Sequence, residues 1–162
     1  MRTFIKKMAL LVAFCATAIA VGYAQTPTSV SGKVDNLVKI YNNVNGVECL
    51  TVAKGSGLEL VKLMLNKQFG KDFMKGVNSV TIVNYSSASQ DTCMALRKEV
   101  ESIGSTLDEF KLDDKKEALG EHDYIRSYAA VSGANAISDF LTAYEGNDMK
   151  VIFYMSGTIK VE

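Results

Sequence analysis

The stretch Met149-Lys150-Val151-Ile152-Phe153-Tyr154-Met155-Ser156-Gly157-Thr158-Ile159 decides the fold. Successive side chains of a β-strand point to opposite faces of the sheet. One face of this stretch carries Met149, Val151, Phe153 and Met155, and the other carries Ile152 and Tyr154. Because both faces are apolar, the pattern predicts a central strand and not an edge strand.

Three further strands are predicted before it, at residues 109–112, 123–131 and 136–144. The segments 132–135 and 145–148 contain the Gly, Asn, Asp and Ser residues that tight turns between antiparallel strands require. The last third of the chain therefore reads as an antiparallel meander. Its 136–144 segment is ambiguous, because Ile137, Phe140, Leu141 and Tyr144 also fit a helix.

Helical periodicity dominates the first part of the domain. Helices are predicted at 34–43, at 58–68 and from a cap at Asp91 or Thr92, the last with a buried stripe at Leu96, Val100, Ile103 and Leu107. The 58–68 helix is the most hydrophobic, because Leu60, Leu63 and Met64 widen its apolar face. Strands are predicted at 47–53, buried on both faces, and at 79–85.

These elements predict an α+β fold with the order α-β-α-β-α-β-β-β-β. We expect three helices packed on one face of a mixed sheet, with an antiparallel C-terminal meander.

The N-terminus resembles an export signal. Arg2, Lys6 and Lys7 precede the apolar run 8–21, and small residues lead to a predicted cleavage after Ala24, with Ala20 as the alternative. Residues 1–24 are thus predicted to be a signal peptide, 25–33 a flexible tether and 34–162 a single α+β domain. The expected location is periplasmic or secreted, with no stable membrane span after cleavage.

The net charge and the cysteine content limit the kinds of function that we expect for this protein. The chain has 18 basic and 18 acidic residues, and removal of the leader takes away three basic ones, which leaves a net charge of about −3. Nucleic-acid binding requires a concentrated basic face, so it is not expected. Beyond the leader, Cys49 and Cys93 are expected to be free thiols, with a disulfide between them as the alternative.

No catalytic or metal-binding constellation is evident, and no cofactor is expected. His122 is the one histidine and reads as a solvated loop residue. The segment 54–57 (Lys-Gly-Ser-Gly) lies between a strand and a helix, where an anion could bind, but it lacks the remaining residues of a phosphate loop and indicates a structural turn capped by Ser56. The acidic residues at 108–117 lack calcium-loop spacing.

Tyrosines near the C-terminal strands suggest a contact surface on the helix-free face of the sheet. The candidates are Tyr124, Tyr128, Tyr144 and Tyr154. Ordinary cross-strand packing of these tyrosines is the interpretation that their spacing favours over a contact surface. The predicted function is a non-enzymatic cell-envelope binding or interaction module for an envelope protein or small ligand. The alternative is a small hydrolase or isomerase that uses acidic residues from separate loops.

Several segments together resemble a known family of exported proteins from Gram-negative bacteria, catalogued as domain of unknown function 4252. They are the leader, the strand at 47–53 that leads to the Leu63-Met64 helix, Val80-Thr81-Ile82-Val83, and above all the closing segment 151–157. Many members of that family look like lipoproteins. Here Cys15 follows the bulky Phe14, so no acylation is expected. The resemblance implies an exported α+β protein and transfers no site.

Overall fold

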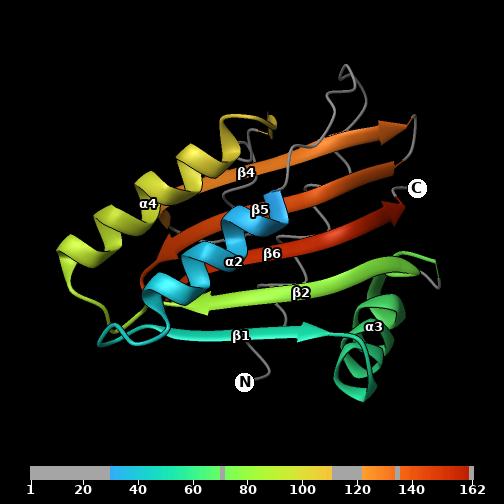
Figure 1. Ribbon diagram of the computed structural model, residues 1–162, viewed down its shortest axis with the longest axis horizontal. Coiled ribbons are helices and arrows are strands. Elements are labelled where there is room, and N and C mark those ends of the chain that lie inside the picture. The colour runs from blue at the N-terminus through green and yellow to red at the C-terminus, as the bar shows by residue number, and fades with distance from the viewer. Residues whose placement is uncertain (1–29, 70–71, 111–121, 134–135, 161–162) are drawn as a thin grey trace.

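The computed structural model describes residues 30–69, 72–110, 122–133 and 136–160 (Figure 1). The predicted signal peptide and residues 25–29 lie outside this part of the chain. The helices are α2 (Val30–Tyr41), α3 (Ser56–Phe69) and α4 (Gln90–Gly104). The strands are β1 (Glu48–Ala53), β2 (Gly76–Asn84), β3 (Asp108–Phe110), β4 (His122–Gly133), β5 (Ala136–Gly146) and β6 (Met149–Lys160).

The six strands form one sheet in the order β1-β2-β6-β5-β4-β3. This confirms the α+β class, the element order and the C-terminal meander. It also confirms that the closing stretch is a central strand, since β6 pairs with both β2 and β5. Residues 136–144 are strand, which excludes the helical alternative.

The expected mixed sheet is wrong, because every described strand pair is antiparallel. The strand at 47–53 is expected to be buried on both faces, yet β1 is an edge strand and most of its side chains are exposed. Val47 is buried, and Cys49 and Val52 are partly buried against the cores on the two faces, so Leu50 is the large apolar side chain of the run that the chain leaves exposed.

The helices do not all cover one face. Helices α2 and α4 pack over the face that carries Ile152 and Tyr154, and both lie across that face of the sheet in Figure 1. Helix α3 instead contributes Leu58 and Leu65 to the opposite core, with Phe153. The prediction failed because both faces of β6 are apolar, so each face needs a cover of its own.

The starts of all three helices differ from the prediction. Helix α3 begins at Ser56, two residues before its predicted start at Leu58. Helix α2 begins at Val30, four residues before the predicted start, so the last part of the predicted tether, 30–33, is helical. Val30 extends the buried stripe of Val34 and Leu37 by one turn. Helix α4 is capped by Ser89, whose hydroxyl accepts a hydrogen bond from the Thr92 backbone N–H at 3.2 Å, and not by Asp91 or Thr92. Among the described helices, none is long and apolar enough to span a membrane.

Candidate functional site

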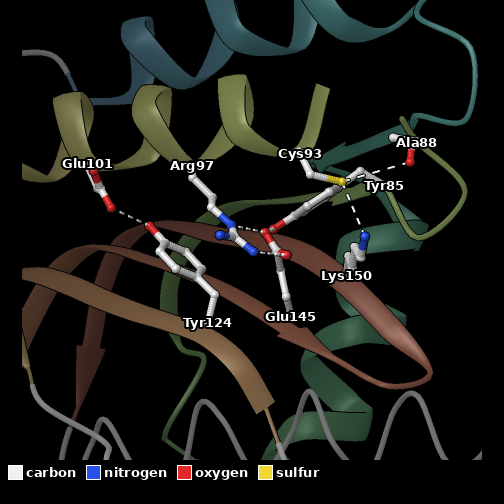
Figure 2. Close-up of polar contacts among 8 residues, drawn as sticks. All are labelled: Tyr85, Ala88, Cys93, Arg97, Glu101, Tyr124, Glu145 and Lys150. Atoms are coloured by element: carbon white, nitrogen blue, oxygen red, sulfur yellow. Dashed lines mark hydrogen bonds and ion pairs between the residues drawn. The ribbon is translucent and has the colours of Figure 1, made fainter. Parts of the chain in front are cut away.

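The most organised group of polar side chains lies between α4 and the sheet (Figure 2). We call Tyr85, Arg97, Glu101, Tyr124 and Glu145 the α4 polar cluster. Arg97 and Glu101 are one helical turn apart on α4, and Tyr124 and Glu145 come from β4 and β5. Tyr85 follows β2. The helix and three strands of the sheet therefore meet at this cluster.

Glu145 is the centre of the cluster and is 2% exposed. Arg97 binds both of its carboxylate oxygens, from Nε at 2.7 Å and from Nη2 at 2.6 Å. The hydroxyl of Tyr85 donates a third hydrogen bond to Glu145 at 3.2 Å. The hydrogen bond with Glu145 raises the pKa of Arg97 further above its usual range. A bidentate, largely desolvated pair of this kind is strong and directional.

Tyr124 extends the cluster toward solvent. The Arg97 guanidinium lies 4.7 Å from the centroid of its ring, and its hydroxyl donates to Glu101 at 2.9 Å. Burial, reinforced by the hydrogen bond to Glu101, raises the pKa of Tyr124. The ring thus shields one side of the buried ion pair from water.

Cys93 lies at the other end of α4, where Lys150 Nζ is 3.4 Å from its sulfur atom. Its thiol is also 3.9 Å from the backbone oxygen of Ala88 (Figure 2). Cys93 and Cys49 are both free thiols, as the sequence favoured. Burial raises the pKa of the Cys49 thiol, which disfavours the reactive thiolate.

The α4 polar cluster is internally satisfied. Both oxygens of Glu145 accept hydrogen bonds from Arg97, and the carboxylate is buried away from solvent. Within the described residues, no buried side-chain nitrogen or oxygen lacks a hydrogen-bond partner. The cluster therefore orients α4 on the sheet.

Alkaline pH should unfold the protein through its buried tyrosines. Burial is the main cause that raises the pKa of Tyr85 and Tyr154 above the ordinary 10.0, and the carboxylates of Glu145 and Asp139 add to it. Because the folded state holds these protons more tightly, their stabilising effect is complete below about pH 10 and is lost as pH rises further. We expect tyrosinate absorbance and loss of circular dichroism to rise together above that pH. In a Tyr85→Phe variant, the pH dependence of the unfolding free energy should be shallower. Tyrosinate that forms while the fold stays intact would contradict this.

The predicted tyrosine contact surface is wrong for three of its four residues. Tyr128, Tyr144 and Tyr154 are buried, and Tyr124 is partly exposed but engaged in the α4 polar cluster. Tyr144 also belongs to the core on one face of the sheet, whereas Tyr128 and Tyr154 belong to the core on the other. The sequence could not show that both faces are covered at these positions.

The other residues that the sequence suggested as candidate sites lie in different elements of the fold. Residues 54–57 form an exposed turn in which Lys54 and Gly55 have positive φ angles, and Ser56 begins α3. His122 begins β4. The acidic segment 108–117 lies outside the described residues from 111 onward. In the described part of the chain, no three His, Cys, Asp or Glu residues are grouped to hold a metal ion.

Sequence reasoning missed the outer face of α3. Leu60, Leu63 and Met64 were assigned to its buried face, but they are 59%, 68% and 43% exposed. They follow the i, i+3, i+4 spacing on the side opposite Leu58 and Leu65, which are buried. The sequence contained the signal, since Leu60, Leu63 and Met64 lie on the side of the helix opposite Leu58 and Leu65, so that α3 is apolar on two opposite sides.

An open hollow of about 500 Å³ adjoins this outer face. It is lined by Glu59, Lys62, Leu63, Asn66 and Lys75. Asn66 accepts a hydrogen bond from the Met74 backbone N–H at 2.8 Å, which fixes the far wall of the hollow to α3. The outer face of α3 thus combines protruding apolar side chains with a concave edge.

Comparison with family models, with curated proteins and with solved structures found no match. The resemblance to the exported family therefore stays a prediction.

Proposed function

We propose that this chain is a non-enzymatic interaction module of the bacterial cell envelope that docks a protein partner through the outer face of α3. The observation that carries the proposal is the exposure of Leu60, Leu63 and Met64 on one helical face. Contiguous exposed apolar side chains of this kind mark interaction sites in soluble proteins.

The distribution of exposed apolar residues supports a specific surface. In the described part of the chain, six large hydrophobic residues are exposed, and three of them lie within five consecutive positions of α3. The hollow beside Leu63 favours a protein over a flat lipid surface, because a protruding side chain can enter it. A partner segment that presents one or two apolar side chains would fill it.

The α4 polar cluster favours docking over catalysis. Glu145 is the one acidic side chain buried among the described residues, and Arg97 neutralises it. The hydrolase or isomerase alternative requires acidic groups poised at a site, and this ion pair does not supply one.

Site-specific photo-cross-linking in the native host tests the proposal. A photoreactive residue in place of Leu63 should yield one discrete cross-linked protein. The same residue in place of Glu99, which is exposed on α4, should not. Adding Leu60→Ser and Met64→Ser should lower the cross-linked yield at least tenfold, because the partner loses its apolar contacts. The two added substitutions should change the unfolding free energy by less than about 1 kcal/mol, since both side chains are exposed. Equal cross-linking at positions 63 and 99 would contradict docking through α3.

A further inference from the structure

Strand β1 is an edge strand that lacks the usual protection. It pairs with β2 along its whole length, without a register shift, and forms the end of the described sheet. The opposite edge strand, β3, has only three residues, whereas β1 has six. Natural edge strands are blunted by proline, by bulges or by inward charges, and Glu48–Ala53 has no proline and no bulge. Its central residue Leu50 is apolar and 56% exposed. Such an edge is a template for another strand.

The sequence of this edge is complementary to itself. When two copies of one strand pair antiparallel, the two-fold axis is perpendicular to the sheet, and a residue must lie on the axis opposite its own copy. With Thr51 on the axis, Leu50 faces Val52 of the second copy. In the same register, Cys49 faces Ala53 of the second copy, and Glu48 lies beside Lys54, the turn residue that directly follows the strand of the second copy. Each apolar residue then meets an apolar residue, and each end of the pairing brings opposite charges together.

Neighbouring registers lack this match. An axis at Leu50 places Glu48 opposite Val52, and an axis at Val52 places Leu50 opposite Lys54. Registers between these positions are excluded, because a shift of one residue sends the side chains of the two copies to opposite faces. The Thr51 register is therefore the favoured one.

We propose that a second copy of this chain pairs with β1 antiparallel about a two-fold axis at Thr51, so that the two six-stranded sheets become one continuous sheet. The hydrogen-bonding edge of β1 is then covered by the partner copy, and the exposed Leu50 gains an apolar cross-strand neighbour. Because the axis is perpendicular to the sheet, the two α3 helices lie on the same face of the dimer. A partner would meet two docking faces, which increases avidity. This last consequence rests on the proposed function, whereas the pairing itself does not.

Charge reversal tests the register. Sedimentation equilibrium of the purified chain should show a reversible dimer. Glu48→Lys and Lys54→Glu should each weaken dimerisation about tenfold, since each places like charges at both ends of the paired strands. The double variant Glu48→Lys/Lys54→Glu should restore it to within about threefold. Asn84→Ala is the control for the bond that the Asn84 side-chain amide donates to Glu48 at 3.3 Å, and it should leave dimerisation unchanged. A monomeric wild-type chain, or a double variant weaker than both single variants, would overturn the proposal.

Disulfide trapping provides an independent readout. In a Cys49→Ser background, Thr51→Cys should form a covalent dimer on mild oxidation, because directly opposite residues lie about 4.5–5.5 Å apart at Cα, within disulfide reach. Glu48→Cys should remain uncross-linked, since its two copies would be about 20 Å apart. Both positions are exposed. Equal trapping at the two positions, or trapping at neither, would overturn the register. The Leu60→Ser/Leu63→Ser/Met64→Ser variant should still dimerise, so failure of α3 docking and failure of β1 pairing are distinguishable.

Discussion

Replacing Arg97 with Met should lower the free energy of unfolding by about 3–5 kcal/mol, because it leaves the Glu145 carboxylate buried without its cation. Glu145 is 2% exposed, and Arg97 donates two of the three hydrogen bonds that satisfy it. Urea denaturation followed by circular dichroism measures the loss, and an unchanged slope with denaturant would show that the folded state is intact.

Two variants separate this effect from general damage to the surface. Arg97→Met/Glu145→Gln should recover most of the stability, because Gln carries no charge and still accepts a hydrogen bond from Tyr85. Lys75→Met breaks the exposed pair with Asp72, whose atoms are 3.6 Å apart, and should cost less than about 1 kcal/mol. If Arg97→Met costs no more than Lys75→Met, the α4 polar cluster does not stabilise the fold as described.

Replacing Gly157 with Ala should cost about 2–4 kcal/mol, because two separate effects combine. Gly157 has a φ angle of +106°, a backbone conformation that residues with a Cβ atom rarely adopt. An added Cβ would also overlap the carbonyl oxygen of Gly76 and lie 2.8 Å from the backbone nitrogen of Asn78. Both contacts are with the backbone of β2, next to the bulge between Val77 and Ser79, so relief would require the central strands to separate.

Substitutions at two other glycines separate the conformational strain at Gly157 from the steric overlap there. Gly55 has φ +87° with open space around it, so Gly55→Ala measures conformational strain alone, and we expect about 1 kcal/mol. Gly133 has neither a positive φ nor a neighbour within 4 Å, so Gly133→Ala should be close to neutral. Thermal unfolding of the three variants side by side provides the comparison. Equal losses in all three would contradict a steric origin at Gly157.

Local periodicity was sufficient to predict the elements and their order. The stripe of Leu96, Val100 and Ile103 located α4, and the alternation in 149–159 located β6 at the centre of the sheet. Which face each helix covers could not be derived, because α3 has apolar side chains on two opposite sides and β6 is apolar on both faces. Periodicity in the sequence shows that one face of an element is buried, but it does not show which other element packs against that face.

The α4 polar cluster could not have been found from the sequence. Arg97 and Glu145 are 48 residues apart, and Glu145 was expected in a turn. It lies in β5 instead, one residue before the end of the strand, and its position under α4 follows from sheet order, which no spacing rule supplies. The edge position of β1 was missed for a related reason. Its apolar run indicates burial on both faces, whereas most side chains of Glu48–Ala53 are exposed.

The central place of β6 has a consequence for how the polypeptide is made. This strand joins β2, which precedes α4, to the meander of β4 and β5, and it is synthesised after every other described strand. Until Met149–Lys160 has been synthesised, the two parts of the sheet share no hydrogen-bonded neighbour. Folding that waits for such long-range pairing is slow. The six-stranded sheet of the nascent polypeptide is therefore completed only after β6 has been synthesised.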